Sequence, residues 1–182
     1  MKILFFAGSL RKDSYNKKFV REAQRAASAI KGIETDFLDL KDFPMPPYDG
    51  DIEDGPGIPE ATKKLGARIM AADALVIATP EYNGSIPGTL KNVIDWLSRE
   101  DTVSLENKPL LLLAASPGAL GGVRVLWQAR VPFEVIGTHV FPGMMGLPGA
   151  AAAFDDQGHL KDEKTAKRLN DLINQFVEYH RT

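Results

Sequence analysis

The chain has 182 residues, of which 44% are hydrophobic, and its formal net charge is −2. This length and apolar content suffice for one well-packed domain over residues 1–182, and no shift in composition marks a second. The chain has no cysteine, which excludes disulfides, thiolate-bound metal and a cysteine nucleophile. The weak net charge favours no nucleic-acid partner, and the three scattered histidines predict no metal site.

The N-terminal apolar run is too short for a signal peptide, and a polar loop follows where a cleavage region would have to be. No apolar run approaches the length of a membrane span. We therefore expect a soluble protein in the cytoplasm, with no membrane insertion.

Strand-like apolar runs alternate with helical periodicity along the chain. The pattern predicts strands at residues 3–7, 33–38, 74–79, 109–115 and 138–141. It predicts helices at residues 16–30, 59–72, 89–99, 122–136 and 162–180, with a kink at Pro132. Residues 43–59 are too rich in proline, glycine and acid for regular structure, and residues 142–149 are expected to form a loop.

The third and fourth predicted strands are nearly continuous apolar runs, ALVIAT and LLLLAA, as in a parallel sheet covered on both faces. Five strand–helix units of this kind predict an α/β three-layer sandwich with the flavodoxin-like strand order 2-1-3-4-5. Right-handed crossovers then bring the loops after strands 1, 3 and 4 to one edge of the sheet.

The loop GSLRKDSYN, residues 8–16, joins the first strand to the first helix. Its Ser9, Ser14 and Asn16 are hydrogen-bonding residues, and Arg11 and Lys12 are cations, so the loop suits a phosphate at a helix N-terminus. In a second interpretation, Ser14 or Asn16 only caps the helix. The loop fits neither the P-loop nor the dinucleotide fingerprint.

The two other loops are PEYNGSIPG, residues 80–88, and SPGALGG, residues 116–122. Asn83-Gly84 is a common turn dipeptide, and glycines 118, 121 and 122 can serve only to turn the chain into a helix. Together, however, three loops of small residues leave backbone groups exposed around a cleft. Such a cleft suits a flat polar ring joined to a phosphate, and flavin mononucleotide (FMN) fits best.

Three motifs resemble those of the flavodoxin-like NAD(P)H-dependent FMN reductases, which include quinone, azo-dye and chromate reductases. They are G-S-x-R-x-x-S-x-N at residues 8–16, P-E-Y-N-x-S-x-P-G-x-L-K-N-x-I-D-W at residues 80–96, and S-x-G-x-x-G-G-x-R at residues 116–124. The resemblance spans nearly the whole chain, and the second motif is the most specific. Flavodoxins carry a different, threonine-rich phosphate loop.

The resemblance implies FMN as cofactor and NADPH or NADH as electron donor. It places the phosphate in the first loop, the isoalloxazine ring at the second and its pyrimidine side at the third. The cofactor-binding residues so implied are Ser9, Arg11, Ser14, Tyr15, Asn16, Pro80, Glu81, Tyr82, Asn83, Gly84, Ser116, Pro117, Gly118, Gly121 and Gly122. No side chain is expected to be catalytic, because flavin N5 carries the hydride. Glu81 is expected to contribute through its backbone N–H, and its use as a proton donor is the alternative.

The resemblance further implies a homodimer or homotetramer, with Asp95, Trp96, Arg124 and Trp127 at subunit contacts. The expected reaction passes hydride through the flavin to small-molecule acceptors such as quinones, azo compounds, chromate or free flavin, by a ping-pong mechanism. Two alternatives stay open at this point. One is a flavodoxin-type electron carrier, and the other is a non-catalytic flavin- or nucleotide-binding sensor.

Overall fold

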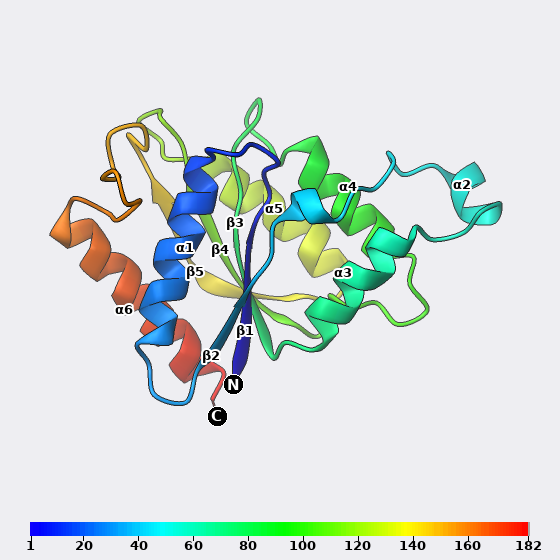
Figure 1. The fold of residues 1–182 in the computed structure, drawn as a ribbon, viewed down its shortest axis with the longest axis horizontal. Coiled ribbons are helices and arrows are strands. Elements are labelled where there is room, and N and C mark those ends of the chain that lie inside the picture. The colour runs from blue at the N-terminus through cyan, green and yellow to red at the C-terminus, as the bar shows by residue number, and fades with distance from the viewer. Residues whose placement is uncertain (182) are drawn as a thin grey trace.

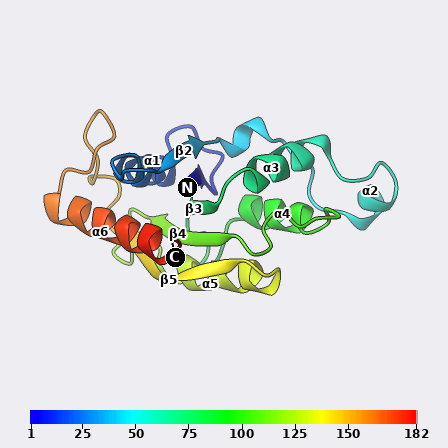
Figure 2. The same cartoon turned by 90° about the horizontal axis from the view of Figure 1, so that it is seen from below.

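The computed structural model describes residues 1–181. Its centre is a sheet in which every neighbouring pair of strands is parallel, and Figures 1 and 2 show helices on both faces. The strands are β1 (Lys2–Ala7), β2 (Glu34–Phe37), β3 (Ala74–Ala78), β4 (Pro109–Ala115) and β5 (His139–Leu147). The helices are α1 (Tyr15–Ser28), the 3-10 turn η1 (Leu40–Asp42), α2 (Gly50–Asp54), α3 (Glu60–Met70), α4 (Gly88–Leu97), α5 (Val123–Val135) and α6 (Glu163–Tyr179).

The strands lie in the order β2-β1-β3-β4-β5, which confirms the predicted flavodoxin-like arrangement. The chain passes from β1 outward to β2, returns to β3 on the other side of β1, and then continues to β5. The carboxyl ends of β1 and β3 therefore flank the point where the winding reverses, which is where open α/β sheets bind ligands.

The alternation of side chains along β1 explains why both faces of the sheet need a layer of helices. Ile3 and Phe5 point to the face covered by α1 and α6, whereas Leu4 and Phe6 point to the face covered by α3, α4 and α5. All four side chains are buried, and β3 is buried throughout. A strand with two buried faces requires the continuous apolar sequence seen here.

The predicted helices and strands are all present, and most ends differ from the prediction by one or two residues. The fifth strand is the exception, because residues 142–147 continue it rather than forming a loop. Val140 pairs with Leu110 and Met144 pairs with Leu112, so the strand bulges in between. Pro142 lies in this bulge on an edge strand, where its lack of an N–H removes no hydrogen bond between strands.

Residues 43–59 also contain more structure than predicted, since α2 forms a short helix in their middle. The side chain of Asp49 caps this helix by accepting a hydrogen bond from the N–H of Asp51 at 2.9 Å. The acidic residues that argued against regular structure thus stabilise a helix start. In α5, the helix runs through Pro132, and the predicted kink stays a prediction.

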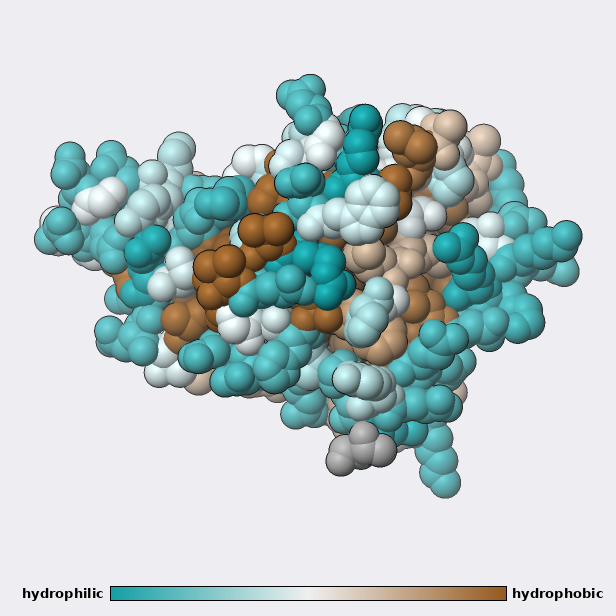
Figure 3. Space-filling model, turned by 180° about the vertical axis from the view of Figure 1, so that it is seen from behind, coloured by the Kyte–Doolittle hydropathy of each residue, from teal (hydrophilic) through white to brown (hydrophobic). Residues whose placement is uncertain are grey.

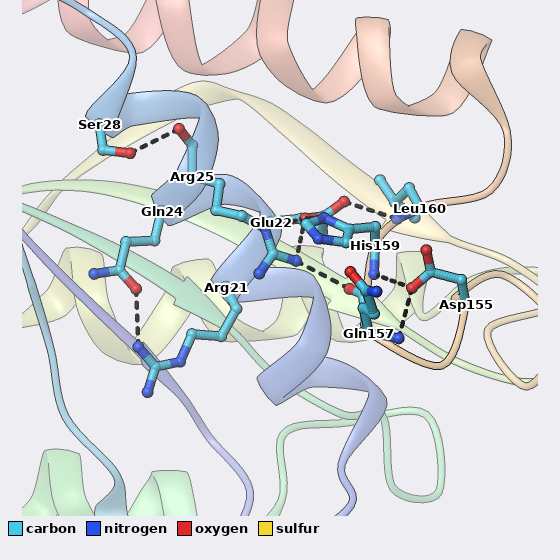
Figure 4. A network of polar contacts seen from close by, with 10 residues as sticks. Arg21, Glu22, Gln24, Arg25, Ser28, Asp155, Gln157, His159 and Leu160 are labelled. Atoms are coloured by element: carbon cyan, nitrogen blue, oxygen red, sulfur yellow. Dashed lines mark hydrogen bonds and ion pairs between the residues drawn. The ribbon is translucent and has the colours of Figure 1, made fainter.

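The segment between β5 and α6 is tied to α1 by the polar contacts drawn in Figure 4. Glu22 on α1 accepts a hydrogen bond from the N–H of Leu160 at 2.7 Å and lies 3.3 Å from Nδ1 of His159. Asp155 closes the turn by accepting from the N–H groups of Gln157 and His159 at 2.9 and 2.8 Å. Among residues 1–181, no helix is long and apolar enough to cross a membrane.

Candidate functional site

Ser14 ends the loop that leaves β1 and caps α1. Its Oγ accepts a hydrogen bond from the N–H of Asn16 at 3.2 Å, so the capping interpretation is confirmed. Ser9 Oγ accepts from the N–H of Arg11 at 3.4 Å. Both serines are buried, and within residues 1–181 neither hydroxyl donates a hydrogen bond. Two donor protons therefore stay available at this loop.

Backbone N–H groups of the same loop are also unused. Those of Leu10, Lys12 and Asp13 donate to no group in the described part of the chain. The side chains of Arg11 and Lys12 are exposed and have no partner there either. Free N–H groups and cations at the start of a helix are the groups that an anion site requires.

Asn16 has a different role from the predicted one of phosphate ligand. Its side chain is 2% exposed; its Oδ1 accepts from the N–H of Ala115 at 2.8 Å, and its Nδ2 donates to the carbonyl of Ala115 at 2.9 Å. Ala115 is the last residue of β4. The carboxamide therefore ties the first loop to the third and positions both.

Gly8 brings the first loop against the second. A Cβ atom at this position would lie 2.9 Å from Oγ1 of Thr79, the residue that follows β3. The N–H of Gly8 donates to the carbonyl of Ala78 at 2.9 Å. The three loops predicted to lie together are thus joined by direct contacts at one edge of the sheet.

The loop after β3 forms the tight turn that its sequence predicts. Tyr82 and Ser85 exchange two backbone hydrogen bonds of 3.0 Å, and Asn83 and Gly84 between them have φ values of 52° and 78°. Asn-Gly is favoured in such turns because both residues tolerate positive φ. Tyr82 at the turn is exposed.

Glu81 in this loop is held by the helix that follows β4. Its carboxylate forms an ion pair with Arg124, whose Nε donates at 2.7 Å, and accepts from the N–H of Val125 at 3.3 Å. The Glu81 side chain is 8% exposed. The carboxylate thus joins the second loop to the start of α5.

The third loop is shaped by its glycines and by β5. Ser116 Oγ accepts from the N–H of Gly118 at 3.2 Å. Gly121 has a φ of 61°, and a Cβ there would lie 2.7 Å from the backbone N of Pro148. The loop therefore packs its glycine backbone directly on the end of β5, while Pro117 and Gly118 stay exposed.

Within residues 1–181, no three His, Asp or Glu side chains lie close enough together to hold a metal ion.

Trp96 on α4 is expected from the sequence at a subunit contact. Its side chain is 0% exposed within its own chain, and its Nε1 donates to the carbonyl of Pro46 at 2.8 Å. That part of the prediction is wrong, because Trp96 lies on the inner face of α4.

The parallel sheet and its three small-residue loops define a flavodoxin-like nucleotide-binding protein. The chain belongs to the NADPH-dependent FMN reductase family, whose model matches residues 1–152. This is a family of flavin-dependent oxidoreductases, with FMN as cofactor and NADPH as electron donor.

Similar proteins cover nearly the whole chain. It is 37% identical over 175 residues to the NAD(P)H-dependent FMN reductase PA1204 of Pseudomonas aeruginosa, covering 95% of this chain and 91% of the relative. It is 34% identical over 181 residues to a quinone reductase of Escherichia coli, covering 98% and 95%. Among solved structures, FerB, a flavoenzyme NAD(P)H:(acceptor) oxidoreductase from Paracoccus denitrificans, superposes with a TM-score of 0.82 at 32% identity over 99% of this chain and 97% of that one.

Proposed function

We propose that this protein binds FMN at the three loops and transfers hydride from NAD(P)H to quinones. The observation that carries the proposal is the cluster of unused donors in the first loop. These are the N–H groups of Leu10, Lys12 and Asp13, with the hydroxyls of Ser9 and Ser14. A phosphate would satisfy them, and Arg11 would supply charge.

The second and third loops would hold the ring. The N–H groups of Glu81 and Asn83 donate to nothing within residues 1–181, and Pro117 and Gly118 in the third loop are exposed. The two N–H groups would donate to the polar edge of a flat ring, and the exposed residues would lie against it. Donors there stabilise developing negative charge in the way an oxyanion hole does.

When bound, FMN supplies the atom that accepts and returns the hydride, so the chain itself orients the reactants and excludes water. In the proposed reaction, NAD(P)H loses a hydride and becomes NAD(P)⁺. The quinone takes up that hydride and one proton from solvent and becomes a hydroquinone. Reduction of azo compounds, chromate or free flavin, and a cytoplasmic location, stay predictions.

NAD(P)H and the quinone would bind in turn at the same position over the flavin ring. The exposed loops around Asn83 and Gly118 would leave one ring face accessible, and the sequence contains no dinucleotide fingerprint for a separate nicotinamide site. Both points support the ping-pong mechanism expected from the sequence.

A second copy of the chain would complete the assembly. Along α5, Trp127, Val131 and Val135 are 57%, 61% and 80% exposed, although they are large and apolar. Their spacing of four residues puts them on one stripe, and Figure 3 shows apolar side chains gathered on this face. A cavity of about 700 Å³ between α4 and α5 adjoins the stripe. We therefore place the dimer contact on α5, with Arg124 and Trp127 and without Trp96.

The binding proposal is tested with purified protein and two flavins. We expect yellow protein that is bleached by NADPH, and tighter binding of FMN than of riboflavin. Arg11→Ala should weaken FMN about tenfold, since hydrogen bonds to charged groups contribute about 1.5–3 kcal/mol, and should leave riboflavin unchanged. Arg168→Ala, at an exposed arginine on α6, is the matched control.

Three results would contradict the proposal. Equal losses for FMN and riboflavin in Arg11→Ala would show that the first loop does not hold the phosphate. Colourless protein that neither binds FMN nor oxidises NADPH would favour a nucleotide-binding sensor. FMN-bound protein that does not oxidise NADPH would favour a flavodoxin-type carrier.

A further inference from the structure

A small pocket lies beside the first loop, on the side facing α4 rather than α1. Its volume is about 290 Å³, and its walls include Leu10, Lys41, Phe43, Met45 and Val93. Leu10 belongs to the first loop, between Ser9 and Arg11. Figure 1 shows the light-blue turn after β2 close to the loop that leaves β1. The pocket therefore begins where the proposed phosphate site ends.

The pocket is built by fixed contacts. On α4, Asn92 Oδ1 accepts from the N–H of Tyr48 at 2.7 Å and Nδ2 donates to the carbonyl of Pro46 at 2.9 Å, which secures the segment carrying Met45. Asp39 caps η1 by accepting from the N–H of Lys41 at 3.1 Å. The walls are thus held in place without a ligand, which lowers the entropic cost of binding one.

The charge at the pocket is uneven. Lys41 is the cation that lines the pocket, and its side chain has no hydrogen bond or ion pair within residues 1–181, although its charge contributes to lowering the pKa of Asp39. The nearby carboxylate of Asp39 is already paired with Lys17, whose Nζ lies 2.5 Å away. Asp42 is adjacent in sequence but does not line the pocket. Within residues 1–181, the pocket therefore combines apolar walls with a lysine whose ammonium group forms no direct ion pair.

We propose that this pocket binds the adenosine end of NADPH, with Lys41 facing its 2′-phosphate; the inference rests on the proposed function. Apolar walls with a few polar groups suit a purine, and a volume of about 290 Å³ is at the small end of ligand pockets, enough for one part of a dinucleotide. A lysine ammonium is a point charge that binds phosphate. Lys41 is thus the residue that selects NADPH over NADH.

The binding test needs no turnover. FMN-loaded protein is titrated by calorimetry with adenosine 2′,5′-bisphosphate and, separately, with AMP, which lacks the 2′-phosphate. We expect Lys41→Ala to weaken the bisphosphate about tenfold, as for loss of one charge-assisted contact, and to leave AMP unchanged. Lys41→Arg should restore most of the affinity. Lys63→Ala, at an exposed lysine of α3, should change neither ligand.

A kinetic test uses donors of different length. Lys41→Ala should raise KM for NADPH about tenfold at unchanged kcat, while KM for NADH and for reduced nicotinamide mononucleotide should stay as in the parent. Equal effects on all three donors would overturn the role of Lys41, because the shortest donor has no adenosine.

The two proposals can fail separately. If the parent protein binds FMN and oxidises NADPH but does not bind adenosine 2′,5′-bisphosphate, the pocket assignment is wrong and the reductase function stands. If the bisphosphate binds in a Lys41-dependent manner but the protein neither holds FMN nor oxidises nicotinamide, the pocket stands as a 2′-phosphoadenosine site and the proposed function fails.

Discussion

At the scale of single residues, the side chains that organise the site differ from those that would touch a ligand. The side chains of Asn16 and Glu81 form hydrogen bonds within the protein. Asn16 links the first loop to β4, and Glu81 links the second loop to α5. The side chain of Arg11, by contrast, has no partner within residues 1–181. The buried groups therefore set the positions of the loops, and the exposed groups are left for the ligand.

Asn16→Ala should destabilise the fold and weaken FMN. It removes both partners of Ala115, and each buried group left without a hydrogen bond costs about 1–3 kcal/mol. Urea unfolding should show the loss, and FMN titration should show weaker binding because two loops lose their link. Asn174→Ala, at an exposed amide on α6, is the matched control. An Asn16→Ala protein as stable as the parent would refute this role.

At the scale of elements, β5 and the third loop depend on each other. Gly121 and Gly146 pack backbone to backbone, since a Cβ on Gly146 would lie 2.8 Å from the carbonyl oxygen of Gly121. The continuation of β5 past its bulge is what brings Gly146 there. The shape of the third loop is thus decided by a strand that is distant in sequence.

Gly121→Ala should be clearly more destabilising than Gly149→Ala. Both glycines have a positive φ, 61° and 59°, so both variants carry the backbone penalty of about 1–2 kcal/mol. A Cβ at Gly121 also meets the backbone of Leu147 and Pro148, whereas a Cβ at Gly149 meets nothing within 4 Å. Chemical unfolding of both variants measures the difference, and equal losses would rule out the close approach.

Asp162, which caps the N-terminus of α6, should make the free energy of unfolding depend on pH in the acidic range. The hydroxyl and N–H of Thr165 donate to Asp162 at 2.6 and 2.9 Å and lower the pKa of its carboxyl group. A carboxyl with a lowered pKa in the folded state stabilises the fold above its unfolded pKa, about 3.9, and this stability is lost as pH falls further.

Thermal unfolding at about pH 5 and about pH 3 tests this linkage. Asp162→Asn keeps a good helix cap but cannot titrate, so its melting temperature should fall less than that of the parent over the same interval. An identical fall in both proteins would mean that Asp162 does not contribute to the acid dependence.

At the scale of the whole molecule, the apolar stripe on α5 bears on assembly. Contiguous exposed apolar surface marks contact sites in otherwise polar proteins. Val131→Glu should give monomers by light scattering at micromolar concentration, because a charge would be buried in the contact. Lys64→Glu, at an exposed position of α3, should leave the assembly unchanged. A parent protein that is monomeric and fully active would show that the stripe is not a dimer contact.

Steady-state kinetics tests whether donor and acceptor share one position. Initial rates against NADPH at several quinone concentrations should give parallel double-reciprocal lines, and excess quinone should inhibit competitively with NADPH. Replacement of Asn83 by a bulky residue should slow both half-reactions, since on the proposed function the same turn would border the ring in each. Intersecting lines with a stable ternary complex would require two separate sites.

The sequence by itself determined the strand order, the positions of the helices and the three loops of the site. Apolar runs such as LLLLAA require two covered faces, and Asn83-Gly84 encodes its turn locally, so neither depends on distant residues. For Ser14 the sequence leaves two interpretations open, because a serine before a helix can cap it or bind an anion.

Only the tertiary structure decided which polar groups are free. Nothing near Asn16 in sequence indicates that Ala115, 99 residues away, occupies its carboxamide, and nothing near Trp96 indicates that Pro46 covers it. The extension of β5 through Pro142 likewise depends on pairing with β4. Hydrogen-bond partners and burial depend on segments that are distant in sequence and meet in space, so a local sequence pattern cannot predict them. Helices, strands and turns can be predicted because periodicity and turn preferences act over a few neighbouring residues.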